Sequence, residues 1–151
     1  MDEEKTIIKI KKMHEKAVIP HYEHEGDAGL DLYSCEDMIL YPGDRKLVPT
    51  GLQVEIPKGY EMQIRPKSGL ALKKGITIPN TPGTVDSGYR GEVGVILLNT
   101  SGEIFEIKAG EKIAQAVIAK VEQAMIEEAS ELSDTSRGGG GFGSTGLTKS
   151  E

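Results

Sequence analysis

Asp86 and Tyr89 are the residues best suited to chemistry, because they lie together in a glycine-punctuated stretch, residues 83–92. Apolar residues precede and follow this stretch, a pattern that predicts two strands joined as a hairpin with the glycines in its turn. A carboxylate there could act as a general base, and an aromatic ring could stack on a ligand at the mouth of the hairpin. An ordinary hairpin with a solvated aspartate is the simpler alternative, so the rest of the chain must decide.

Residues 65–74 form a second candidate, because they interrupt the pattern of strands around them. Pro66 ends a strand, and Ser68 is predicted to be the N-cap of a helix of about one and a half turns. A hydroxyl, free backbone amides and the flanking Lys67 could together seat an anion. A capped connector with no ligand explains the segment equally well.

Two further polar residues stand out against the strands that contain them. Asp31 alternates with Leu30 and Leu32, so it is expected to face away from the core on a strand that leaves a turn. Gln115 is expected to share a face with Ile113, where packing favours an apolar side chain. A glutamine in such a row usually has a partner, which is either internal or a ligand.

The elements that must position these residues are predicted to be short strands. From residue 38 to residue 65, apolar and polar residues alternate, and Pro/Gly turns break the alternation about every eight to twelve residues. This pattern predicts an all-β antiparallel sandwich or barrel. Residues 121–132 are ambiguous, because their composition favours a helix although everything before them is β.

Composition and charge limit the classes of function. The net charge of −6 argues against the backbone of a nucleic acid as the main partner. Cys35 is the single cysteine, so it is expected to be a buried structural thiol. The acidic start lacks the apolar region of a signal peptide, and the longest apolar run, near residues 93–98, is too short to span a bilayer. A cytoplasmic protein with no membrane partner is expected.

The C-terminal segment differs in composition from everything before it. Glycines dominate residues 137–146, and such a segment cannot bury enough surface to order itself. We therefore expect a β domain over residues 1–133 and a flexible tail over residues 134–151. The tail leads to no second domain, and it contains a cation, an aromatic ring and hydroxyl donors that could close over a ligand.

Five segments in one order resemble the five motifs of the trimeric dUTP diphosphatases, the dUTPases. The resemblance covers almost the whole chain, and five motifs in register are far more specific than any one of them. The segments are residues 27–31, 65–71, 83–92, 110–115 and 137–146.

This resemblance implies a jelly-roll-like antiparallel β-sandwich or barrel that forms a homotrimer with its sites at the subunit interfaces. The tail of one subunit would close over a site made by the others. The implied reaction is hydrolysis of dUTP to dUMP and pyrophosphate with Mg²⁺, which limits uracil in DNA and supplies dUMP for dTMP synthesis. The family pattern also favours an extended chain over residues 121–132.

The resemblance assigns the nucleoside end of the substrate to the glycine-punctuated stretch and its neighbour Asn80. Asp86 would deprotonate the water that attacks the α-phosphorus, and Tyr89 would lie under the deoxyribose and leave no room for a 2′-hydroxyl. Asn80 would lie near the base and the α-phosphate. Close backbone would read the uracil edge and exclude the methyl group of thymine, at residues Gly83, Thr84, Val85 and Gly94.

It assigns the phosphate end to other segments. Lys67, Ser68 and the amide of Gly69 would hold the phosphate chain, Gln115 would contact the α-phosphate, and Asp31 would bind Mg²⁺ through coordinated waters. In the tail, Arg137 would reach the γ-phosphate and Phe142 would cover the uracil. The tail residues expected at the substrate are Arg137, Phe142, Gly143, Ser144 and Thr145.

Lys67 departs from the family pattern, which usually has Arg at this position. Lysine keeps the charge but loses the planar two-point fork, so we expect a weaker grip on phosphate rather than loss of activity. Two other functions stay open on the same fold. A dCTP deaminase would need an added acid/base glutamate, for which Glu92 is the nearby candidate, and a silent nucleotide-binding regulator would be expected to lack Asp86 or the tail.

Overall fold

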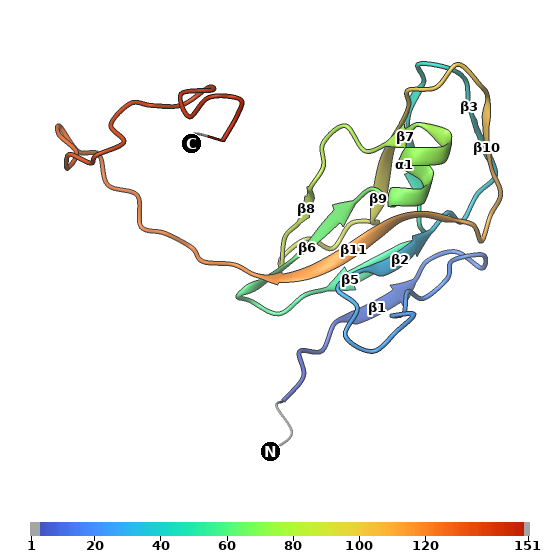
Figure 1. Ribbon diagram of the computed structural model, residues 1–151. Coiled ribbons are helices and arrows are strands. Elements are labelled where there is room, and N and C mark those ends of the chain that lie inside the picture. The colour runs from blue at the N-terminus through green and yellow to red at the C-terminus, as the bar shows by residue number, and fades with distance from the viewer. Residues whose placement is uncertain (1–3, 150–151) are drawn as a thin grey trace.

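The computed structural model describes residues 4–149, which form an antiparallel β-body with one short helix and a C-terminal arm (Figure 1). The elements in chain order are β1 (Lys9–Lys12), β2 (Leu30–Tyr33), β3 (Met38–Leu40), β4 (Arg45–Pro49), β5 (Leu52–Glu55), β6 (Tyr60–Arg65), α1 (Ser68–Lys74), β7 (Ile76–Thr77), β8 (Gly83–Val85), β9 (Gly94–Asn99), β10 (Phe105–Ile107) and β11 (Lys112–Lys120). Within this described range, no helix is long and apolar enough to cross a membrane.

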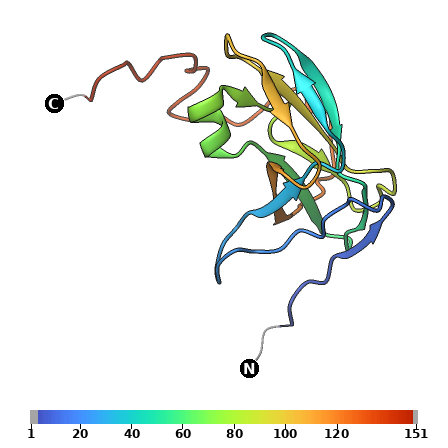
Figure 2. The same ribbon diagram turned by 90° about the vertical axis from the view of Figure 1, so that its right-hand side faces the viewer.

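All strand pairs are antiparallel, as the alternating pattern predicted. The largest sheet has the order β2-β11-β6-β8, and a second sheet has the order β4-β9-β7. The pairs β1-β5 and β3-β10 complete the body, and the two views show the sheets stacked in layers with α1 at one end (Figures 1 and 2). The predicted all-β antiparallel sandwich is confirmed, and its topology is jelly-roll-like.

The core lies between the sheets and consists almost entirely of aliphatic side chains. Alternate residues of each strand point inward, so that Val95 and Leu97 of β9 are fully buried while their neighbours are not. Leu32, Leu40 and Val48 pack in the same cluster. Burial of such side chains stabilises the fold by about 1.5–3 kcal/mol each. The single cysteine, Cys35, is buried as expected, and burial raises the pKa of its thiol.

The two strands around the glycine-punctuated stretch do not form the predicted hairpin. β8 pairs with β6 in the four-stranded sheet, whereas β9 pairs with β4 and β7 in the other sheet. The loop of residues 86–93 therefore crosses from one layer to the other. The sequence pattern identifies both strands but not their partners. Apolar residues on both strands, such as Val85 and Val95, are buried in one core whether the strands pair with each other or lie in separate sheets.

Two smaller expectations are also revised, and a third is met. The N-cap of α1 is Lys67, which has extended backbone, and not Ser68 as expected. Ser68 is the first residue of the helix, and no side chain makes a capping hydrogen bond. The register of β11 shifts between Lys112 and Ala114, so Ile113 enters the core while Gln115 faces outward, away from the core row. Residues 121–132 contain neither helix nor strand and are exposed, in line with the extended chain favoured there, and Val121 at their start donates to the Gly59 carbonyl at 2.9 Å (Figure 1).

Candidate active site

The loop between β8 and β9 brings most of the predicted nucleoside-binding residues around one cavity of about 180 Å³. Asp86 is exposed at its rim, and the Tyr89 side chain is 46% exposed. The sequence did not single out Ile64 and Val93, which also line it. The predicted residues that line this cavity are Asn80, Gly83, Thr84, Val85, Asp86, Tyr89 and Gly94.

Glycine at two of these positions allows close backbone approach. A Cβ added at Gly94 would lie 2.6 Å from Leu47 Cδ1, and one added at Gly83 would lie 3.3 Å from Asn80 Nδ2. Side chains at these positions would therefore displace their neighbours and fill the cavity. The bare backbone of both strands is left as a wall of the cavity, which is the arrangement that reading a ligand edge by main-chain groups requires.

A side chain of β5 and the backbone amide of residue 51 hold the crossing loop in place, and sequence reasoning missed these contacts. The Glu92 carboxylate accepts a hydrogen bond from the Gly51 amide at 2.9 Å, and Gln53 Nε2 donates to the Arg90 carbonyl at 2.7 Å. Arg90 in turn donates to the Ser87 carbonyl at 2.8 Å. The partners of these bonds from β5 and residue 51 are about forty residues away in sequence, so no local pattern announces them.

A second group of polar residues gathers on the outer face of the four-stranded sheet. Asp31 of β2 and Arg65 of β6 are both register partners of Gln115 on β11, so the three form one cross-strand row. Gln115 Nε2 donates to the Pro66 carbonyl at 2.9 Å, which fixes the entry to α1 and hence the position of Lys67. The predicted phosphate residues Lys67 and Gln115 are thus brought together with Asp31.

Asp31 is far more buried than a strand residue facing away from the core would suggest. Its side chain is 8% exposed, because two lysines cover it. Lys67 Nζ donates to one carboxylate oxygen, and Lys112 Nζ lies 3.0 Å from the other and 3.0 Å from Glu23. Lys112 is a member of this site that sequence reasoning missed, because the bulge in β11 hides its face.

Charge governs the ionisation of this cluster. Burial alone raises the pKa of the Asp31 carboxyl, but hydrogen bonds from Lys67 and Lys112 outweigh it and hold the pKa below its ordinary value. The same contacts raise the pKa of the Lys112 ammonium. Asp31 therefore stays ionised at neutral pH between the two lysines. With Glu23 on Lys112 the positive and negative charges of the cluster balance, so the cluster offers an anionic ligand its two ammonium groups rather than a net positive charge.

The residues present fit Mg²⁺ only as a hydrated ion. Asp31 is a single carboxylate with both oxygens engaged, and within residues 4–149 no group of three His, Cys, Asp or Glu could hold a metal ion. Mg²⁺ dehydrates reluctantly and is often held through one carboxylate plus substrate phosphates. Asp31 can therefore accept a hydrogen bond from a water bound to such an ion. The direct ligands of the ion must come from other groups.

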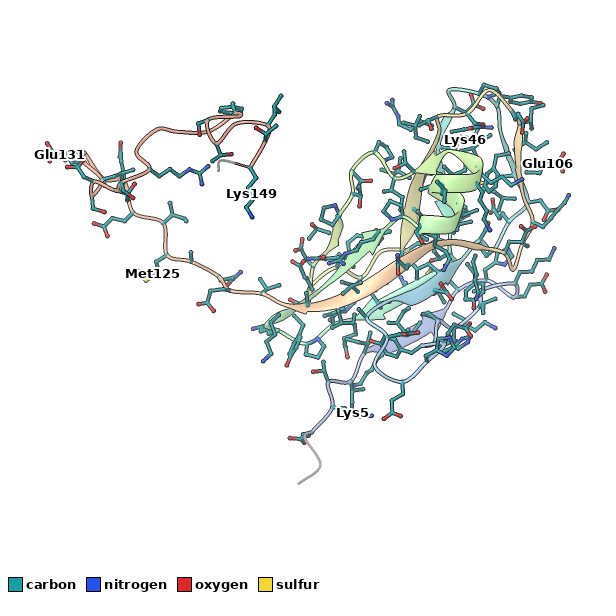
Figure 3. The ribbon with its side chains drawn as sticks, in the orientation of Figure 1. Lys5, Lys46, Glu106, Met125, Glu131 and Lys149 are labelled. Carbon is teal, nitrogen blue, oxygen red and sulfur yellow. The ribbon has the colours of Figure 1, made fainter. Side chains whose placement is uncertain are left out.

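The predicted tail residues are not brought to either group in this chain. The tail lies apart from the β-body, beyond the arm that contains Met125 and Glu131 (Figures 1 and 3). Arg137 Nε donates to the Gly140 carbonyl at 2.8 Å, and Phe142 is fully exposed with a left-handed φ of 49°. The remaining predicted tail residues, all exposed, are Gly143, Ser144 and Thr145.

A larger cavity of about 570 Å³ lies elsewhere, between the N-terminal segment and the β-body. Its walls are mainly aliphatic, with Ile8, Leu52 and Ile118 among them, and it contains none of the predicted site residues. Size alone therefore does not locate the chemistry. The smaller cavity at the crossing loop has the carboxylate and the aromatic ring.

We expect Asp31→Asn to lower the free energy of unfolding at pH 7 by about 1–3 kcal/mol, because two charge-assisted hydrogen bonds weaken. The folded-state pKa of Asp31 is lowered, so its stabilisation is present above the unfolded pKa of about 3.9 and is lost as the pH falls through the folded value. Urea unfolding at matched ionic strength measures this effect. The difference in the free energy of unfolding between wild type and variant should shrink as the pH falls toward about 3.

Glu55→Gln provides the control for this measurement. Glu55 is an exposed carboxylate that pairs with Lys9 at 3.5 Å and Arg90 at 3.4 Å, and exposed pairs contribute about 0–1 kcal/mol. A difference between wild type and Asp31→Asn that stays constant from neutral to acid pH would contradict the assignment.

The fold and the site define the class of protein first: an all-β, jelly-roll-like protein with one candidate site on a loop between sheets and a separate cluster of lysines around Asp31. Residues 15–146 match the family model described as dUTPase. A deoxyuridine 5′-triphosphate nucleotidohydrolase of Nautilia profundicola is 63% identical over 139 residues, which cover 92% of this chain and 98% of that protein. The chain therefore belongs to the dUTPase family.

Two solved structures resemble this chain throughout the β-body. The dUTPase of Staphylococcus bacteriophage 80alpha with dUpNHpp has a TM-score of 0.88 at 27% identity and covers 93% of this chain and 99% of that one. A mutant dUTPase of phage phi11 of S. aureus, described with a coordinated structural Mg(II) ion, has a TM-score of 0.78 at 25% identity and covers 85% of this chain and 99% of that one.

Proposed function

We propose that this protein hydrolyses dUTP to dUMP and pyrophosphate, and that Asp86 is the general base. The observation that carries the proposal is the cavity at the crossing loop, which seven of the predicted nucleoside-binding residues line together. Membership of the dUTPase family supports the same reaction, since the relative from Nautilia profundicola is named a dUTP nucleotidohydrolase. Asp86 and the tail, which a silent regulator would be expected to lack, are both present, and Glu92, the candidate acid/base of a deaminase, already accepts a hydrogen bond from the Gly51 amide.

In the proposed mechanism the nucleoside enters the cavity between β8 and β9. Backbone groups near Gly83 and Gly94 read the uracil edge, and a thymine methyl group clashes with this close wall. Tyr89 packs against the deoxyribose. Asp86, at the exposed rim, orients a water toward the α-phosphorus and accepts its proton as the bond to pyrophosphate breaks.

The phosphate chain lies on the lysine cluster in this proposal. Lys67 and Ser68 contact the phosphates at the start of α1, and Gln115 uses the amide proton that is not bonded to Pro66. Asp31 would hold a hydrated Mg²⁺ through water, and the ion would supply neutralisation of charge on the phosphates. Lys67 must leave Asp31 in part to reach a phosphate, so we expect its grip to be weaker than that of a two-point arginine.

We further propose that the site is completed within a homotrimer. The crossing-loop cavity and the lysine cluster share no lining residue in the described chain, so one chain presents them as separate parts. The arm projects away from its own β-body and exposes Met125, Ile126 and Leu132, apolar side chains that another subunit can cover (Figure 1). Such an arm would deliver the glycine-rich tail to a neighbouring site.

Pyrophosphate release from dUTP, dCTP, dTTP and UTP, each with Mg²⁺, tests the proposed reaction. We expect turnover of dUTP at least about 10²-fold above the others in kcat/KM, because a clash or a missing hydrogen-bond partner rejects each analogue. Ammonia release from dCTP would instead identify a deaminase. Binding of dUTP with no turnover of any nucleotide would indicate a nucleotide-binding regulator.

A further inference from the structure

The ring of Tyr89 lies directly against the α-carbon of Gly91. A Cβ added at Gly91 would lie 2.6 Å from Tyr89 Cζ and 2.9 Å from Cε2, and closer still to the phenol oxygen. Real Cβ atoms essentially never approach this closely, and the atoms in the way belong to a rigid ring. Gly91 does not have a left-handed φ, so the close contact with the ring is the feature that requires glycine here.

This contact lies on one side of the Tyr89 ring, and the candidate site lies on the other. Tyr89 Oη donates to the Glu92 carbonyl at 2.9 Å, which pins the end of the ring to the same short stretch of backbone. Tyr89 also lines two adjoining cavities of about 180 Å³ each, one of which contains Asp86. The depth of the ring in the loop therefore sets the space that is left beside Asp86 for a sugar.

The loop backbone beneath the ring is itself held from outside. No β-ladder joins β8 to β9, so residues 86–93 are held by hydrogen bonds to other elements, among them backbone bonds that join Val93 to Thr50 and Leu52. Gln53 holds the Arg90 carbonyl and the Gly51 amide holds the Glu92 carboxylate, which places an anchored residue on each side of Gly91. The backbone cannot easily move back to make room for an added side chain.

We propose that Gly91 is a specificity-determining residue, which sets how deep the Tyr89 ring lies and so discriminates deoxyribose from ribose. The inference rests on the proposed function, in which Tyr89 packs against the sugar. A methyl group at position 91 must push the ring outward or rotate it. A displaced ring would no longer close the space that a 2′-hydroxyl needs, so ribose would be accepted more readily.

Gly91→Ala tests this role, and Gly88→Ala is its matched control. Gly88 lies on the same loop without a left-handed φ, and no described atom lies within 4 Å of an added Cβ there. We expect the ratio of kcat/KM for dUTP to that for UTP to fall by roughly tenfold or more in Gly91→Ala, and to change less than about threefold in Gly88→Ala. Thermal melts establish that both variants are folded.

A double-mutant cycle separates the contact from a general loss of structure. In a Tyr89→Leu background the ring is absent, so adding Gly91→Ala should leave the dUTP to UTP ratio unchanged. A further fall of the ratio in that background would overturn the proposal, as would an unchanged ratio in Gly91→Ala alone. A wild-type protein that does not turn over dUTP would instead overturn the proposed function, before the ratio is considered.

Discussion

Asp86→Asn is expected to lower kcat for dUTP by roughly 10²–10⁴-fold, because asparagine cannot accept the proton of the attacking water. The substitution keeps the size of the side chain and one acceptor oxygen. The loop should keep its shape, since Asp86 supports it through its backbone carbonyl, which accepts from the Tyr89 amide at 3.1 Å. We expect the Kd of a non-hydrolysable dUTP analogue to change by less than about fivefold, because binding uses other groups.

Steady-state pyrophosphate release and titration calorimetry provide the two measurements for this prediction. Asp37→Asn is a suitable control, because Asp37 accepts from the Ala109 amide at 2.9 Å, which an asparagine oxygen can also do, and it lies outside both parts of the site. Turnover by Asp86→Asn within a few-fold of wild type, with the control normal, would show that another group takes the proton.

Removal of residues 134–151 is expected to lower kcat by roughly 10³-fold, because Arg137 would no longer stabilise charge on the γ-phosphate. Loss of Phe142 would also let water into the site and weaken the charge interactions inside it. The melting temperature should stay close to that of the full chain. In the described part of the tail, every hydrogen bond joins residues of the tail to one another.

Mixing the truncated chain with full-length Asp86→Asn distinguishes closure by a neighbour from closure by the same chain. The truncated subunit supplies Asp86 and the other supplies a tail, so refolded mixtures should regain activity that neither parent has. Each parent refolded alone is the control. Mixed trimers that are isolated and remain inactive would show that a tail closes only over its own subunit.

The strands were predictable because their causes are local. Alternation of Leu52 and Val54 with polar neighbours, and turns such as the one at Gly59, are properties of a few adjacent residues. Strand partners are not local, and this is why β8 and β9 were joined wrongly as a hairpin. A connection of about eight residues with several glycines can either close a hairpin or cross to another sheet.

Several candidate site residues can be singled out from the sequence, but their supporting contacts cannot. Asp31 and Gln115 stand out because each is polar within an otherwise apolar strand. Lys112 gave no such signal, because a register shift decides which way it points and a bulge has no marker in the sequence here. Gln53 occupies a polar position in the alternating pattern of its strand, and only the fold shows that it reaches the Arg90 carbonyl.

The cavity at the crossing loop has walls from two different layers, since Ile64, Gly83 and Val85 belong to one sheet and Gly94 to the other. Its width is therefore the local spacing between those sheets. That spacing is set by interior side chains such as Val95, which are packed as densely as an organic crystal. In the proposed mechanism, base selectivity is thus partly a property of the interior, and substitutions that never touch a nucleotide are expected to change which bases fit.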